Sequence, residues 1–115
     1  MTELVLREAR GAAVHLVLNR PDKLNSLNVP VFQALDAHVR AIAANPEGVG
    51  AVVIRGAGRC FSAGHDLGDI AAGERLPEPN YQSRVIERIA ALPLPVISAV
   101  HGHCYTGALE LALAA

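Results

Sequence analysis

The sequence predicts one α/β domain built around a buried sheet, and three patterns predict it. Two apolar runs typical of strands, at residues 4–8 and 13–19, stand close together at the start of the chain. Two continuous apolar runs, at 51–54 and 96–100, have the length and content of strands covered on both faces. Segments with apolar residues at helical spacing separate these runs, and such alternation is typical of an α/β fold.

The first half of the chain predicts a hairpin followed by a helix. Arg10-Gly11 joins the first two runs as a tight turn. After a polar loop at 20–23, Asn28 is placed to cap a helix with Pro30 in its first turn, a position that proline tolerates. The helix carries one apolar stripe, formed by Phe32, Leu35, Val39 and Ile42. Asn45-Pro46 ends it.

The second half repeats the strand and helix pattern. After the run at 51–54 come a glycine-rich segment, a polar stretch and a second amphipathic helix around residues 85–92. The run at 96–100 is followed by a turn and by a helix beginning at Ala108, and the sequence ends at Ala115, two turns into that helix. We therefore expect residues 1–115 to form a single, incomplete domain.

Composition excludes several classes of protein. The 115 residues carry a net charge of −1 and only 3% aromatic residues, which is unlike a nucleic-acid-binding surface. Glu3 stands where a secretory signal needs a basic region, and Pro93 and Pro95 break the most apolar stretch, so we expect a cytoplasmic protein without a membrane partner. Cys60 and Cys104 stand alone, which favours reduced thiols.

Two glycine-bearing loops, at 56–67 and 102–107, each follow a buried strand and are the best candidates for a site. Loops at the ends of neighbouring strands meet at one edge of a sheet. Glycine lets backbone N–H groups approach a ligand closely, so the N–H groups of His65 and Gly107 can form an oxyanion hole. The alternative is that both loops are tight turns packed for their own sake.

Glu110 lies about one turn into the last helix, within an apolar run. Desolvation there would raise the pKa of its carboxyl group toward the range used in general acid/base catalysis. The alternative is a solvated helix face, and periodicity does not separate the two.

Other polar residues give weaker indications. His101, His103 and Cys104 suggest a metal only if Cys60 or His65 joins them, so we expect no metal site. The basic side chains Arg20, Lys23, Arg55 and Arg59 lie in or beside the loops and can meet phosphates or simply remain solvated.

Three motifs in this order resemble the enoyl-CoA hydratase/isomerase (crotonase) superfamily. Residues 18–27, Leu-Asn-Arg-Pro-Asp-Lys-Leu-Asn-Ser-Leu, resemble its first CoA-contacting loop. Residues 56–67 resemble its Gly-x-Gly-x-x-Phe-x-Ala-Gly-x-Asp-Leu segment, and residues 100–113 resemble its second glycine loop and acidic helix. The resemblance implies a spiral of ββα units, truncated here before the C-terminal helices, and a homo-oligomer, either a trimer or a hexamer.

The resemblance also implies roles for individual residues. The N–H groups of His65 and Gly107 would hold the thioester oxygen of an acyl-CoA and stabilise an enolate, and Glu110 would match the first catalytic glutamate of the hydratases. The CoA moiety would meet five residues, namely Lys23, Leu24, Ala63, Asp66 and Leu67. Thr106 and Ala108 replace glycines that are common in the family, a change expected to be mild.

These matches predict an enoyl-CoA hydratase that adds water to a 2-enoyl-CoA without a metal or redox cofactor. Its partner would be the acyl-CoA substrate. The alternatives are another reaction of the family, such as enoyl-CoA isomerisation, and a non-catalytic acyl-CoA-binding or assembly module.

Overall fold

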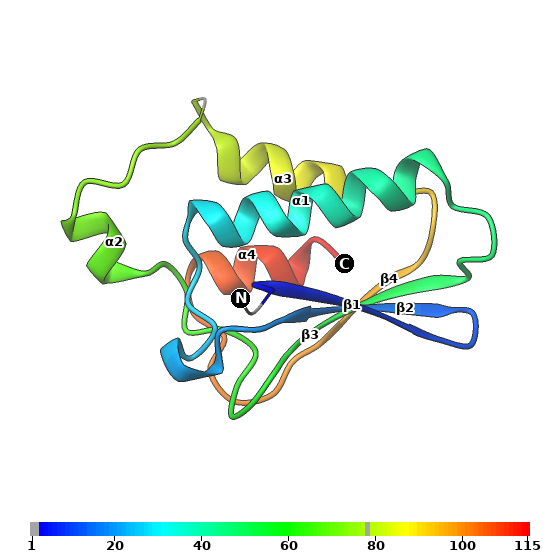
Figure 1. The fold of residues 1–115 in the computed structure, drawn as a ribbon, viewed down its shortest axis with the longest axis horizontal. Coiled ribbons are helices and arrows are strands. Elements are labelled where there is room, and N and C mark those ends of the chain that lie inside the picture. Colours follow the sequence, from blue (N-terminus) through cyan, green and yellow to red (C-terminus); the bar gives the residue numbers. More distant parts are fainter. Residues whose placement is uncertain (1–2, 78) are drawn as a thin grey trace.

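The fold was examined in a computed structural model, which describes residues 3–77 and 79–115. One four-stranded sheet carries the helices α1, α3 and α4 on the same side (Figure 1). The elements in chain order are β1 (Val5–Arg10), β2 (Ala13–Leu18), a 3-10 turn (Pro21–Lys23), α1 (Val29–Ala44), β3 (Ala51–Gly56), α2 (Leu67–Ala71), α3 (Tyr81–Ala90), β4 (Val96–Ala99) and α4 (Gly107–Leu113). The predicted order of hairpin, helix, strand, loop, helix and strand is confirmed.

The sheet has the order β1-β2-β3-β4 and is mixed. The predicted hairpin pairs β1 with β2 antiparallel, with Gly11 at a φ of 60° in its turn. Strands β2, β3 and β4 then run parallel. Strands β1 and β2 and helix α1 form a ββα unit, and α1 is the crossover that returns the chain to β3, parallel to β2.

Helix α1 begins and ends where the sequence predicts. The Asn28 side-chain oxygen accepts a hydrogen bond of 3.0 Å from the N–H of Val31, and Pro30 lies in the first turn. The apolar stripe of this helix is buried against the sheet. Helix α3 packs beside α1, where the Arg88 guanidinium donates bonds of 2.7 and 3.0 Å to the two carboxylate oxygens of Asp36. These charged hydrogen bonds satisfy a carboxylate that is only 6% exposed.

The prediction that β3 and β4 are covered on both faces is wrong for the described part of the chain. Burial alternates along both strands, and Ile97 in β4 is 52% exposed. Helices α1, α3 and α4 lie on one face (Figure 1), and the other face carries a polar cluster. In that cluster Arg55 donates to Glu8 over 2.9 Å and to His15 over 3.1 Å. The apolar runs of β3 and β4 therefore did not reveal that, among the described residues, no helix covers the face that carries Arg55.

Thr106, just before α4, has a strained backbone. Its φ of 44° and ψ of −112° lie in a region that glycine adopts and that β-branched residues avoid. The replacement of a family glycine by Thr106 is therefore not the mild change that the sequence suggested. Tertiary contacts hold the residue there, since the chain on either side of it packs against the first glycine loop.

Thr106→Gly is expected to stabilise the protein by about 1 kcal/mol. Glycine removes the backbone strain, and this gain exceeds the extra conformational entropy that glycine loses on folding. Thr106→Ala keeps a Cβ in the same backbone conformation and should gain less. Urea unfolding of the three proteins measures the difference, and a lower midpoint for Thr106→Gly would contradict the assignment of strain.

Candidate functional site

Three loop segments lie side by side at the end of the sheet where β3 and β4 finish. The segment after β2 contacts the first glycine loop, with hydrogen bonds of 3.0 Å from Ala63 N–H to the Leu24 carbonyl and 2.7 Å from Leu27 N–H to the Gly64 carbonyl. The first glycine loop pairs in turn with the second through a bond of 3.0 Å from Ser62 N–H to the His103 carbonyl. The predicted meeting of the two glycine loops is confirmed, and the segment after β2 joins them.

Asn25 connects these segments and was not singled out from the sequence. Its side chain is 1% exposed, donates to the carbonyls of Ala57 and Cys60 over 2.8 and 2.9 Å, and accepts from Arg20 N–H over 2.8 Å. Its φ of 53° is left-handed, a conformation that asparagine tolerates better than most residues. An asparagine in a loop is a common turn residue, which was the available sequence signal. Its carbonyl partners, Ala57 and Cys60, are distant in sequence.

His65 and Gly107, the two predicted oxyanion-hole residues, are in direct contact. A Cβ added to Gly107 would stand 2.8 Å from His65 Nε2 and 3.0 Å from His65 Cε1, so the ring lies against the Gly107 Cα. Among residues 3–77 and 79–115, neither backbone N–H of this pair donates a hydrogen bond to a protein acceptor. Two N–H groups without acceptors are thus available for a ligand oxygen.

Glu110 is exposed on α4, and its side chain makes no hydrogen bond or ion pair within the described ranges. Its neighbours Leu109 and Leu113 are also exposed, at 47% and 74%. The buried side of α4 is formed by Gly107, Ala108 and Leu111 instead. Of the two alternatives for Glu110, the structure shows the solvated helix face, because α4 buries the side opposite and leaves Glu110 exposed together with Leu109 and Leu113.

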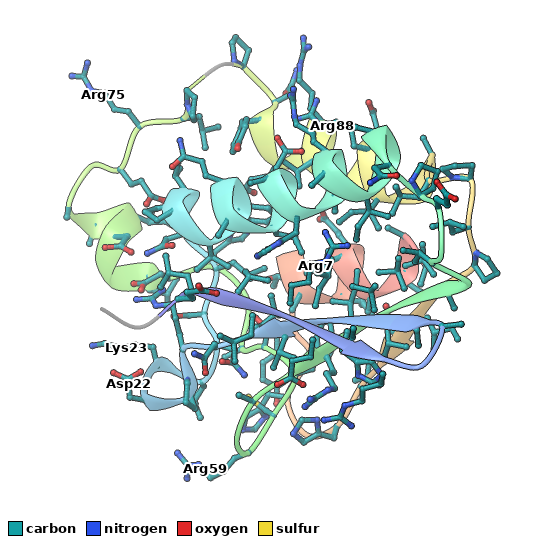
Figure 2. The ribbon with its side chains drawn as sticks, turned by 45° about the vertical axis from the view of Figure 1, so that its right-hand side comes forward. Arg7, Asp22, Lys23, Arg59, Arg75 and Arg88 are labelled. Carbon is teal, nitrogen blue, oxygen red and sulfur yellow. The ribbon has the colours of Figure 1, made fainter. Side chains whose placement is uncertain are left out.

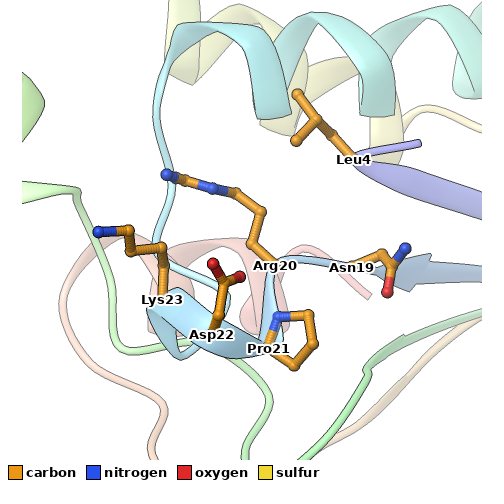
Figure 3. Close-up of a pocket in the computed structure, with 6 residues that line it drawn as sticks. All are labelled: Leu4, Asn19, Arg20, Pro21, Asp22 and Lys23. Atoms are coloured by element: carbon orange, nitrogen blue, oxygen red, sulfur yellow. The ribbon is translucent and has the colours of Figure 1, made fainter. Parts of the chain in front are cut away.

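The residues predicted to meet CoA have different surroundings. Leu24 and Ala63 are brought together by their backbone hydrogen bond. Lys23 is exposed in the 3-10 turn beside a pocket of about 490 Å³, where its side chain extends to the same side as that of Arg20 (Figure 3). Leu67, at the start of α2, is 78% exposed and makes no contact with this pocket.

The cations near the loops have different surroundings. Lys23 and Arg59 extend outward on the side of the molecule away from α1 and α3 (Figure 2). Arg55 is held by Glu8, and Arg20 is held by Asp66 over 3.1 Å, with both side chains of the latter pair about 15% exposed. Lys23 and Arg59 are therefore better placed than Arg20 and Arg55 to meet an incoming phosphate.

Asp66 is held in place by protein groups. One carboxylate oxygen accepts from Asp69 N–H over 3.0 Å and caps α2, while the other accepts from Arg20 and from Ser26. The backbone hydrogen bond from Asp69 and the interactions with Arg20 and Ser26 lower the pKa of Asp66, against the opposing effect of burial. The carboxylate thus fixes the start of α2 relative to the loop after β2.

Asp66→Asn is expected to cost about 1 kcal/mol of stability at neutral pH, because asparagine keeps the cap but loses the charge opposite Arg20. The folded protein lowers this pKa, so the charged form adds stability above the ordinary carboxyl pKa of 3.8. That contribution disappears as the pH falls through the lowered pKa. Urea unfolding of both proteins across this range checks the sign: an unchanged gap between them at acid pH would contradict it.

The cysteine and histidine side chains show no metal geometry in the described ranges. No three His, Cys, Asp or Glu side chains there come close enough to hold an ion. His101 donates to the Gly58 carbonyl over 2.9 Å, and His103 contacts the Tyr105 hydroxyl over 3.0 Å. Both cysteines are free thiols, and burial raises the pKa of Cys104.

No helix in the part of the chain described here is both long and apolar enough to cross a membrane.

Known proteins resemble this chain over almost its whole length. The chain is 32% identical over 120 residues to 1,2-epoxyphenylacetyl-CoA isomerase of Escherichia coli, covering 98% of this chain and 45% of that protein. It is 34% identical over 125 residues to human mitochondrial Delta(3,5)-Delta(2,4)-dienoyl-CoA isomerase, covering 96% and 38% of the two chains. The chain therefore spans less than half the length of these relatives.

A solved structure shows the same fold. The enoyl-CoA hydratase/isomerase from Xanthobacter autotrophicus superposes with a TM-score of 0.88 at 34% identity, over 99% of this chain and 44% of that one. The expected crotonase-like α/β fold is therefore confirmed for the portion present. The sequence pattern of the enoyl-CoA hydratase/isomerase family matches residues 8–115, and the chain belongs to that family.

Proposed function

We propose that the protein is an enoyl-CoA hydratase that adds water to the double bond of a 2-enoyl-CoA thioester. The observation that carries this proposal is the pair of backbone N–H groups at His65 and Gly107, which have no protein acceptor among the described residues and belong to residues in contact. Two such donors aimed at a thioester oxygen would stabilise the negative charge that develops when water attacks the conjugated double bond.

Glu110 is the proposed acid/base group. Its place three residues after Gly107 puts it one helical turn from the candidate oxyanion hole. A carboxylate there can take a proton from attacking water, and in its acid form it can protonate the α-carbon of the enolate. Family hydratases use a second carboxylate as well, which the resemblance assigns to a later loop than any in this chain.

The CoA part of the substrate is proposed to lie along Lys23, Leu24, Ala63, Asp66 and Leu67. The paired backbones of Leu24 and Ala63 support this, because they hold two of the three loop segments at a fixed separation. Lys23 offers an exposed cation for a phosphate. Asp66, whose charge is balanced by Arg20, would contribute by positioning α2. The thioester makes its own α-carbon acidic, so the proposed reaction uses no metal or redox cofactor.

Two alternatives remain within the proposal. The names of the E. coli and human relatives favour an isomerase. The exposure of Glu110 favours a non-catalytic acyl-CoA-binding module, because no described residue orients the carboxylate. Both share the acyl-CoA thioester as ligand and differ from the hydratase in what happens to the double bond.

Crotonyl-CoA tests the function directly. The chain is incubated with this thioester while loss of the conjugated absorbance is followed, and CoA binding is measured in parallel by calorimetry. Hydration supports the leading proposal, and a shifted double bond in the product supports the isomerase. Binding without turnover supports the binding module, whereas no binding contradicts all three.

A trimeric or hexameric assembly and a cytoplasmic location stay predictions. Sedimentation equilibrium of the purified chain tests the first, and fractionation of cells producing it tests the second.

A further inference from the structure

The side chain of His65 lies against Gly107, the second residue of the candidate oxyanion hole. Its ring lies against the Gly107 Cα, with Nε2 and Cε1 as the nearest atoms. The Nε2 edge of the ring therefore stands next to the residue whose N–H is the second proposed donor. The ring is only partly exposed, because the backbone of the first glycine loop pairs with Leu27 on one side and α4 lies on the other.

Gln82 contacts this ring from another element. Its side-chain amide nitrogen, on α3, lies 3.4 Å from His65 Nδ1. An amide NH₂ group can only donate, so Nδ1 accepts and the proton of the neutral imidazole resides on Nε2. The ring nitrogen next to Gly107 is thereby made a hydrogen-bond donor.

This Nε2–H has no acceptor among the described residues, since the contact with Gln82 is the only hydrogen bond of the His65 side chain there. Two residues in contact, His65 and Gly107, thus carry three donors without partners among the described residues: two backbone N–H groups and one imidazole N–H. An acceptor oxygen from a bound ligand would satisfy these donors.

We propose that His65 Nε2–H donates a third hydrogen bond to the thioester oxygen of a bound acyl-CoA, with Gln82 as the positioning residue that keeps the proton on Nε2. This inference rests on the proposed acyl-CoA function and extends it. It makes His65 a residue that distinguishes a thioester from a ligand lacking the carbonyl. It also accounts for glycine at 107, because any side chain there would displace the ring.

The tautomer of His65 tests the first step without any ligand. In the wild-type chain labelled with ¹⁵N-histidine, the shifts and couplings of the His65 nitrogens should show the proton on Nε2. Gln82→Leu, which removes the amide donor, should give a mixture of the two tautomers. The matched control is Gln33→Leu, an exposed glutamine on α1, which should leave the His65 signals unchanged. A proton on Nδ1 in the wild type would overturn the inference and leave the proposed function untouched.

A pair of ligands tests the second step. Butyryl-CoA has the thioester oxygen, and S-butyl-CoA is the matched thioether without it; neither has a double bond to hydrate. The hydrogen bonds to this oxygen should make the wild type prefer butyryl-CoA, and His65→Phe, which removes one of the three, should lose roughly five- to tenfold of that preference. Phenylalanine keeps a ring against Gly107 and has no N–H, so affinity for S-butyl-CoA should change little. Gln82→Leu should lose a smaller part of the preference, and Gln33→Leu none.

The outcomes separate this inference from the function on which it rests. If the wild type prefers butyryl-CoA and His65→Phe keeps the full preference, the third donor is refuted while acyl-CoA binding stands. If the wild type binds neither ligand, both the function and the inference fail. Circular dichroism shows whether each variant is folded, and the tautomer of the wild type remains decisive if His65→Phe does not fold.

Discussion

Asn25→Ala is expected to destabilise the protein by about 3 to 5 kcal/mol. Alanine removes three hydrogen bonds from a site that is 1% exposed, and it leaves the carbonyls of Ala57 and Cys60 and the N–H of Arg20 without this partner. It must also adopt the left-handed backbone of Asn25, which costs alanine more than asparagine. The free energy of unfolding from urea titration measures the loss.

The matched control is Asn45→Ala. Asn45 is exposed at the end of α1, its side chain makes no hydrogen bond to the described residues, and the expected change is within about 0.5 kcal/mol. If both variants lost the same small amount, Asn25 would not be the link between the loops. The consequence for function is direct, because these bonds set the position of the first glycine loop that carries His65.

Glu110→Gln is expected to lower kcat for crotonyl-CoA hydration by roughly 100-fold or more, because glutamine can neither take up nor release a proton. KM should change little, since the amide has nearly the same shape and the side chain lies exposed on α4. Steady-state kinetics over a range of crotonyl-CoA concentrations separates the two parameters.

Glu87→Gln is the control, since Glu87 is an exposed glutamate on α3 whose substitution should leave kcat unchanged. A kcat that Glu110→Gln also leaves unchanged would remove Glu110 from the mechanism and direct attention to another carboxylate. A wild type that binds CoA without hydrating crotonyl-CoA would instead favour the non-catalytic module, to which the exposed position of Glu110 already lends support.

Local chemistry accounts for the parts of the fold that were correctly predicted. The Arg10-Gly11 turn, the Asn28 cap and the apolar stripe of α1 each depend on residues a few positions apart, and all three are confirmed. The short helix α2 was not predicted, because its five residues bury no side chain and so show no apolar stripe. Thr106 was misjudged because its strained backbone is imposed by neighbouring loops.

The candidate site was likewise predicted only in part. His65, Gly107 and Glu110 were identified from glycine spacing and from the family resemblance, and the contact between His65 and Gly107 agrees with that choice. The solvation of Glu110 was undecidable, because periodicity over seven residues does not show which side of a helix meets the sheet. The importance of Asn25 and Gln82 could not be predicted from the sequence, because both act through hydrogen bonds to residues distant in the chain.

The sequence by itself determined the order of the elements, the family and the two glycine loops, because these follow from short-range spacing and from motifs. Only the tertiary structure decided that one face of the sheet remains without a helical layer in the described chain, that Glu110 is solvated and that Gln82 contacts His65. The physical reason is that burial and hydrogen-bond partners depend on how separate segments pack against one another. That packing is not encoded in the spacing of residues within any one segment.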